Sequence, residues 1–386
     1  MRLLALLTFL KASQALLVPP PPGPFDVAVK NFELIDTNRI DTFAPKPNTK
    51  RRIMVSAYLP IDARYGCKDK VVPYVPALTA KAYGKVAGTL GLPENIVKDF
   101  EMKVCNISSV KPKRFHKPKK EYPVALFSPG YQGSRLVYGA MARSLASLGY
   151  IILTVDHTYE AFVVEFPDGT AATAAEFPDN MNSTYKQLEV RTKDESFVIS
   201  QLCNHTLVEQ VFGDFPGTFD PHKVAVYGHS FGGSTAAVTA QRDRRVIGGL
   251  NFDGPMYGSV IEEGLKCTPY ILVGTNMTAP DPVPGWNAFY DRIDAAKMEM
   301  VVKHTRHYAF TDVPLLLTEF KIPAKSEAKV HEVFGTISGR KVEKAANEIM
   351  VGFLDLVFKK EAKKLKAIGK RDGIHVLRRD LVQEEN

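Results

Sequence analysis

The segment Gly228-His229-Ser230-Phe231-Gly232 contains a serine whose neighbours suit it to act as a nucleophile. A buried-strand pattern precedes it at residues 223–227, and small, helix-compatible residues follow it at 233–241. A strand, a sharp turn and a helix hold such a serine in a strained turn at the helix N-terminus, where developing negative charge is favoured. The sequence therefore predicts that Ser230 attacks a carbonyl carbon. The alternative is a glycine-rich turn whose serine has no chemical role.

A serine hydroxyl needs a base to accept its proton, and in chains with this motif the histidine follows the serine. His116, His157, His205 and His222 precede Ser230 and have the wrong order. We expect His229, the variable position of the motif, to point away. His331 and His375 lie in or after the polar C-terminal region. His304 and His307 remain, in the loop after a predicted strand at 298–302, and we favour His307 because the following Tyr-Ala-Phe segment could fix that loop.

An acid must orient the histidine, and two aspartates qualify. Asp253 directly follows a predicted strand at 246–252, with Gly254 beside it to let the chain turn. Asp281 follows the next strand, at 270–274, but lies in a proline-rich loop. Because the carboxyl ends of parallel strands share one edge of a sheet, either could reach the serine. We favour Asp253 and keep Asp281 as the alternative.

The oxyanion formed during attack requires two backbone N–H donors. Phe231, the residue after the nucleophile, supplies one. The other should come from the loop after an earlier strand, and in the segment 128–133 the candidate is the N–H of Tyr131. The alternative for this segment is an ordinary glycine turn.

The elements that must position these residues alternate between strand and helix along the chain. Strands are predicted at 52–59, 124–128, 151–155, 223–227, 246–252, 270–274 and 298–302, and helices at 135–148, 188–212, 233–241 and 342–358. This alternation predicts an α/β fold with a mostly parallel sheet covered on both faces. We expect a single domain over 16–358 with an insertion at about 61–122, followed by a basic tail at 359–386.

The N-terminus predicts secretion. Residues 1–15 combine an early arginine, an apolar run and small residues at 13 and 15, which is typical of a signal peptide. N-glycosylation acceptor sequences begin at Asn106, Asn182, Asn204 and Asn276. The cysteines are Cys67, Cys105, Cys203 and Cys267. In an oxidising compartment they can form two disulfides with three possible pairings. Proximity in the sequence favours Cys67–Cys105 and Cys203–Cys267.

The formal net charge of +8 is concentrated in two runs, at 111–120 and 359–379. Neither run has the aromatic interleaving of a nucleic-acid interface, so we expect no nucleic-acid partner. Solvated charge is the favoured interpretation, with weak association with an anionic membrane surface as the alternative. The sequence contains no metal-ligand cluster, phosphate-binding loop or dinucleotide fingerprint, and we therefore expect no metal and no cofactor.

With these residues in place, the chain resembles the secreted, plasma-type platelet-activating factor acetylhydrolases over much of residues 34–315. The segments that carry the resemblance are 51–56, 127–131, 228–233, 250–253 and 307–312. The resemblance implies an α/β-hydrolase fold, a triad of Ser230, Asp253 and His307, and oxyanion donors at Tyr131 and Phe231. It also implies calcium-independent hydrolysis of short or oxidised acyl groups at the sn-2 position of phosphatidylcholine-like lipids.

The expected function is therefore that of a secreted serine esterase acting on a phospholipid or another small ester. Two alternatives remain. The Pro129-Gly130-Tyr131 segment is also similar to cutinase-like polyester hydrolases, so a cutinase-like or general carboxylesterase is the first. The second is a catalytically silent lipid-binding module that keeps the fold.

Overall fold

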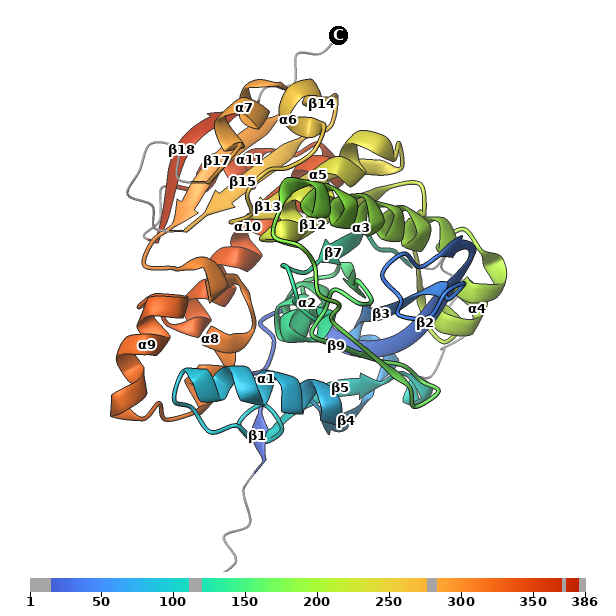
Figure 1. Ribbon diagram of the computed structural model, residues 1–386, viewed down its shortest axis with the longest axis vertical. Coiled ribbons are helices and arrows are strands. Elements are labelled where there is room, and N and C mark those ends of the chain that lie inside the picture. The colour runs from blue at the N-terminus through green and yellow to red at the C-terminus, as the bar shows by residue number, and fades with distance from the viewer. Residues whose placement is uncertain (1–14, 111–119, 276–282, 370–372, 382–386) are drawn as a thin grey trace, which may run out of the picture.

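A large central sheet organises the chain (Figure 1). The computed structural model describes residues 15–110, 120–275, 283–369 and 373–381. Within these ranges the sheet has twelve strands. In spatial order they are β1 (Leu16–Leu17), β5 (Phe100–Asn106), β2 (Asp26–Ile40), β3 (Lys50–Ile61), β8 (Ile151–Asp156), β7 (Val124–Ser128), β12 (Val224–His229), β13 (Val246–Phe252), β15 (Tyr270–Gly274), β17 (Lys297–Val302) and β18 (Ile374–Asp380), with β4 (Lys68–Pro73) paired to β5.

In this sheet the six neighbouring strands β8, β7, β12, β13, β15 and β17 are all parallel to one another, as the alternating pattern predicted. The pairs β2–β3, β3–β8, β4–β5 and β17–β18 are antiparallel. The carboxyl ends of β12, β13 and β17 consequently point to one edge of the sheet, from which the loops carrying the predicted chemistry emerge.

Each face of the sheet packs against its own layer of helices, because successive strand residues point to opposite faces. On β7, Ala125 and Phe127 belong to one apolar core, and Val124 and Leu126 belong to the other. The first core includes α2 (Gly139–Ser147) and α10 (Gly339–Lys359), and the second includes α3 (Met181–Gln201) and α5 (Phe231–Arg242). Figure 1 shows α3 and α5 lying across the same face.

The remaining helices and short strands decorate this framework. The helices are α1 (Ala77–Thr89), α4 (His205–Phe212), α6 (Val260–Glu263), α7 (Trp286–Asp291), α8 (Val313–Leu316), α9 (Ala324–Phe334) and α11 (Lys363–Ala367). The short strands are β6 (Lys120–Glu121), β9 (Val163–Glu165), β10 (Ala171–Thr173), β11 (Gly217–Thr218), β14 (Leu265–Lys266) and β16 (Ile293–Asp294), and the 3-10 turns are η1 (Ala63–Tyr65), η2 (Ile107–Ser109), η3 (Arg135–Tyr138), η4 (His307–Phe310) and η5 (Leu317–Glu319).

Both ends of the sheet differ from the sequence-based expectation. The segment 61–122, predicted as an insertion, contributes β4 and β5, which extend one edge of the sheet. At the other edge, residues 374–380 were predicted to lie in a basic tail outside the domain, but they form β18 and pair with β17. The Arg378 side chain bonds to Glu299 of β17 at 2.6 Å, so a basic side chain here is paired within the sheet. The folded domain therefore reaches Asp380.

One of the two predicted disulfides is present. Cys67 and Cys105 are bonded, with their Cα atoms 5.8 Å apart, and the bond joins the start of β4 to the end of β5. The predicted Cys203–Cys267 disulfide is wrong, because both thiols are free and exposed. Cys203 follows α3 and Cys267 follows β14, and proximity in the sequence does not bring these two surface turns together.

Candidate active site

The serine predicted as nucleophile lies on a tight turn between β12 and α5. Ser230 has φ of 54° and ψ of −128°, a left-handed conformation that a residue with a side chain adopts only under constraint. The two glycines of the motif allow the turn to form. A Cβ at Gly228 would collide with the carbonyl of Gly232, and a Cβ at Gly232 would collide with the carbonyl of Ser128. The turn therefore requires the glycines that made the motif recognisable in the sequence.

The structure brings Ser230, His307 and Asp253 together in one chain of hydrogen bonds. His307 Nε2 lies 2.9 Å from Ser230 Oγ, and His307 Nδ1 lies 2.7 Å from Asp253 Oδ2. Because an ionised carboxylate can only accept, Nδ1 carries the proton and Nε2 is free to accept the one from the serine. The His307 side chain is 36% exposed, so the site opens to solvent on the histidine side.

Asp253 is held firmly at the tip of β13. Its Oδ1 accepts hydrogen bonds from the N–H and hydroxyl of Thr275 at 3.0 and 3.1 Å. Its φ is 52°, and a Cβ at the next residue, Gly254, would collide with the carbonyl of Ser230. The backbone after β13 thus passes directly against Ser230. The alternative acid, Asp281, lies outside the described residues.

The histidine sits on η4, and two buried groups hold this turn in place. Asp312 accepts hydrogen bonds from the hydroxyl of Tyr74 at 2.7 Å and from the N–H groups of Ala140 and Met141 at 2.7 and 2.9 Å. Burial raises the pKa of Asp312 to about 6, and these donors partly offset the shift. The alternative base, His304, instead lies in a turn where its carbonyl accepts the N–H of Thr336 at 3.0 Å.

The second buried group is His229, which was expected to point away from the site. Instead, its Nε2 lies 2.8 Å from the backbone carbonyl of His307, and its ring centre is 4.7 Å from that of His307. A carbonyl can only accept, so Nε2 carries the proton and Nδ1 accepts from the hydroxyl of Tyr138 at 2.9 Å. Burial, with a smaller effect of His307, lowers the pKa of His229 to about 3, and the ring is therefore neutral.

The proposed oxyanion donors flank Ser230. Phe231 is the first residue of α5, and the segment containing Tyr131 passes so close that a Cβ at Gly130 would come within 3.2 Å of the Cβ of Ser230. Among the described residues, no acceptor takes the N–H of Tyr131 or Phe231. Two backbone donors without partners beside Ser230 have the composition that an oxyanion hole would need.

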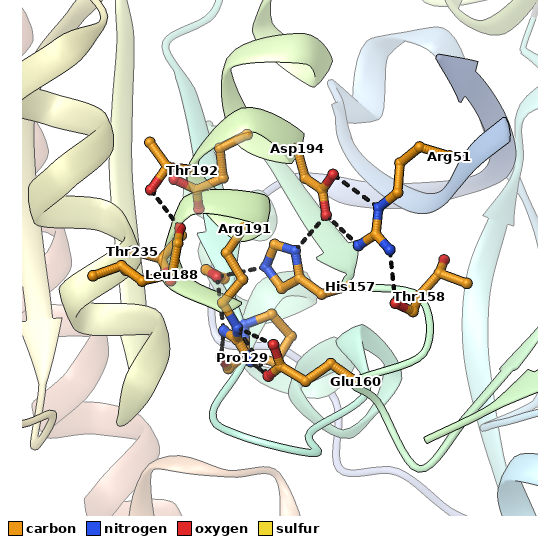
Figure 2. Close-up of polar contacts among 12 residues, drawn as sticks. Arg51, Pro129, His157, Thr158, Glu160, Leu188, Arg191, Thr192, Asp194 and Thr235 are labelled. Atoms are coloured by element: carbon orange, nitrogen blue, oxygen red, sulfur yellow. Dashed lines mark hydrogen bonds and ion pairs between the residues drawn. The ribbon is translucent and has the colours of Figure 1, made fainter. Parts of the chain in front are cut away.

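Sequence reasoning missed a second, buried serine–histidine–aspartate set, whose histidine and aspartate are labelled in Figure 2. His157 Nε2 lies 2.8 Å from Ser128 Oγ, and His157 Nδ1 lies 3.0 Å from Asp194 Oδ2. All three are at most 2% exposed, so no substrate can reach Ser128. Burial and the nearby Arg191 charge lower the pKa of His157. Two sequence features separate this buried set from the candidate catalytic one: Ser128 lacks the G-x-S-x-G motif, and Asp194 follows the histidine along the chain, whereas Asp253 precedes it.

The predicted glycan acceptors, signal segment and basic runs lie only partly within the described residues. Asn106, Asn182 and Asn204 are exposed, as glycan acceptors must be, while Asn276 lies outside the described residues. Residues 1–14 and the basic run 111–119 also lie outside them. Within the described ranges, no helix combines the length and the apolar character needed to span a membrane.

Comparisons with known proteins identify the chain. The model of the family described as platelet-activating factor acetylhydrolase, isoform II, matches residues 47–372. A probable 1-alkyl-2-acetylglycerophosphocholine esterase from Arthroderma benhamiae is 28% identical over 351 residues, covering 87% of this chain and 82% of that protein. A platelet-activating factor acetylhydrolase from Cavia porcellus is 28% identical over 225 residues, covering 52% of this chain and 51% of that protein.

A solved structure of an esterase is also similar to this chain. A ferulic acid esterase from Streptomyces cinnamoneus superimposes with a TM-score of 0.74 at 25% identity, covering 94% of this chain and 100% of the other. The sheet and its helical layers are therefore those of an α/β-hydrolase fold. The chain belongs to the platelet-activating factor acetylhydrolase isoform II family of carboxylic ester hydrolases.

Proposed function

We propose that this protein is a secreted serine esterase that hydrolyses short sn-2 acyl esters of platelet-activating-factor-like phospholipids. The observation that carries the proposal is the hydrogen-bonded chain from Ser230 through His307 to Asp253. Family membership and the names of the relatives from Arthroderma benhamiae and Cavia porcellus support the substrate class.

In the proposed reaction, Ser230 Oγ attacks the ester carbonyl carbon while His307 Nε2 accepts its proton. The bond between the carbonyl carbon and the glycerol oxygen then breaks, and His307 returns the proton to that oxygen. Water attacks the acyl-serine in the second half, with His307 again accepting and returning a proton, and the carboxylic acid leaves. Asp253 holds Nδ1–H throughout and stabilises the imidazolium that forms in each half.

The N–H groups of Tyr131 and Phe231 are proposed to bind the oxyanion in both tetrahedral intermediates. Neither has a competing acceptor among the described residues, so neither must break a hydrogen bond to do so. Donors fixed in advance stabilise the developing charge without the cost of reorganisation.

Secretion is proposed on three features. Residues 1–15 have the pattern of a signal peptide. The Cys67–Cys105 disulfide suits an oxidising compartment. The acceptor asparagines 106, 182 and 204 are exposed, where glycans can be attached.

A substrate series tests the proposal. We expect hydrolysis of phosphatidylcholine analogues to fall steeply as the sn-2 acyl chain lengthens, and a fluorophosphonate probe to label the intact protein but not Ser230→Ala. Activity that is flat across chain lengths would favour a general carboxylesterase or a cutinase-like enzyme. An intact protein that does not label would favour a silent lipid-binding module.

The identity of the acid has its own test, using a matched pair of variants. We expect Asp253→Asn to lower kcat by about 10⁴, because the wrong histidine tautomer is then favoured. Asp281→Asn is the control, for which kcat should stay near that of the unmodified protein. The reverse result would assign the acid to Asp281.

A further inference from the structure

A buried arginine on α3 contacts both segments that carry the proposed oxyanion donors. Arg191 is 1% exposed. Its Nη1 donates to the carbonyl of Pro129 at 2.7 Å and its Nη2 to the carbonyl of Gly130 at 3.2 Å. The guanidinium carbon also lies 4.7 Å from the centre of the Phe231 ring. One side chain therefore joins the segment preceding Tyr131 to the residue that follows the nucleophile (Figure 2 shows the contact with Pro129).

These contacts fix the direction of the proposed donor because a trans peptide group is planar. The carbonyl of Gly130 and the N–H of Tyr131 belong to the same peptide group and point in opposite directions. Holding the carbonyl on Arg191 therefore aims the N–H away from the arginine. The preceding peptide group is held from both sides, since its carbonyl accepts from Arg191 and its N–H donates to the Tyr138 hydroxyl at 3.3 Å.

The arginine is itself anchored. Arg191 Nε lies 2.9 and 2.8 Å from the two carboxylate oxygens of Glu160, and Nη2 also contacts this carboxylate. Nη1 further lies 3.4 Å from Ser128 Oγ, the hydroxyl bonded to His157. Figure 2 shows this network extending from Arg191 through His157 and Asp194 to Arg51. A guanidinium fork with several acceptors keeps one geometry, which the ammonium of a lysine cannot reproduce.

We propose that Arg191, braced by Glu160, is a positioning residue for the oxyanion hole. It holds the Gly130 carbonyl so that the Tyr131 N–H stays aimed at the developing charge. This inference rests on the proposed function, because it assigns a role to a residue that acts through the proposed donors. It also gives the buried Ser128–His157–Asp194 set a function, as part of the support under the same segment.

The variant Arg191→Lys tests the proposal, with Arg143→Lys as its matched control. Arg143 is also 1% exposed and also donates to a backbone carbonyl, that of Lys103 at 3.0 Å, but it lies outside the proposed machinery. Both variants keep the charge and lose the fork. The measurements are kcat and KM on a soluble acetyl ester and on a short sn-2 phospholipid, together with Tm.

A positioning role predicts a particular kinetic signature. We expect Arg191→Lys to lower kcat by about 10- to 100-fold with KM changed by less than about threefold, because oxyanion donors act mainly in the transition state. Inhibition by a trifluoromethyl ketone, which forms a tetrahedral adduct on the serine, should weaken by the same factor as kcat/KM. Inhibition by a non-reacting lysophospholipid should not change. Arg143→Lys should keep kcat within about twofold of the unmodified enzyme.

Several results would overturn the proposal. An Arg191→Lys enzyme with unchanged kcat would do so, as would one whose trifluoromethyl ketone and lysophospholipid affinities fall together. If Arg191→Lys does not fold, Glu160→Gln decides, with at least about a threefold fall in kcat at constant KM expected and no fall refuting the idea. An intact protein without esterase activity, or an active Ser230→Ala, would instead refute the proposed function.

Discussion

We expect a buried glutamate on α3 to make the stability of this protein depend on pH. Glu195 is fully buried, and burial raises its pKa from 4.5 to about 8. The hydrogen bond from Thr239 and the nearby Arg191 charge lower the pKa, and the charges of Asp194 and Asp243 raise it. Glu195 Oε2 lies 2.5 Å from the hydroxyl of Thr239, which also lies 2.9 Å from the carbonyl of Thr235. A hydroxyl donates only one hydrogen. The Thr239 hydroxyl can therefore donate either to the ionised Glu195 carboxylate or to the Thr235 carbonyl, and when Glu195 is protonated its own O–H can donate to Thr239 while that hydroxyl donates to the carbonyl.

The size of the expected loss in the free energy of unfolding follows from the difference between the Glu195 pKa values in the folded and unfolded states. Because the folded-state pKa lies above the unfolded value, the contribution of Glu195 to the free energy of unfolding is greatest below pH 4.5 and falls as the pH rises toward 8. The slope is about 1.4 kcal/mol per pH unit, so the total loss is on the order of 5 kcal/mol. A loss of this size is a large part of the 5–15 kcal/mol that stabilises a typical domain, roughly a third or more.

The variant Glu195→Gln removes this dependence. Glutamine stays neutral in both states, and its amide can still donate to Thr239. We expect Glu195→Gln to gain stability over the unmodified protein by about 1.4 kcal/mol for each unit of pH between about 5 and 8. Urea unfolding at about pH 5, 6.5 and 8 measures this, with the exposed Glu263→Gln as the control. A stability difference that does not change with pH would refute the reasoning.

Other predictions concern the histidine loop and the cysteines. Asp312→Asn should lower the free energy of unfolding at neutral pH by about 1–3 kcal/mol in urea titrations, because an amide nitrogen cannot accept from the buried donors there; an unchanged value would contradict this. Replacing Cys67 and Cys105 by serine should cost about 4 kcal/mol in the same assay, since the disulfide closes a separation of 38 residues; a fall under about 1 kcal/mol would contradict the loop-entropy argument. Cys203 and Cys267 should both react with a thiol reagent in the native protein. If neither thiol reacts, the predicted Cys203–Cys267 disulfide is present after all.

The parts of the site that the sequence could predict depend on local rules. The turn at Ser230 needs its glycines, so the motif itself indicates the geometry. Two general facts, the order of residues along the chain and the convergence of parallel strand ends at one edge, narrowed the histidine to His304 or His307 and the acid to Asp253 or Asp281. Each of these rules concerns the backbone, which a strand–turn–helix pattern largely specifies.

The parts that the sequence could not predict depend on side chains meeting across the fold. Arg191 lies in the middle of a helix, sixty-one residues after Gly130 along the chain, and no spacing rule connects the two. His229 was expected to point away because its position in the motif is variable, yet the ring reaches the backbone of the histidine loop. The Cys203–Cys267 prediction failed for the same reason, since separation along the chain says little about distance in space. In β18, by contrast, the alternation of Ile374 and Val376 was a usable signal that the basic residues masked.

The pairing of β18 with β17 has a practical consequence for making this protein. Without residues 374–380, the backbone N–H and C=O groups on the outer side of β17 would lose their partners. An open strand edge is a template for addition of a strand from another molecule. Truncation before this point should therefore promote aggregation, and purification tags are best placed beyond Asp380, where they leave the last strand intact.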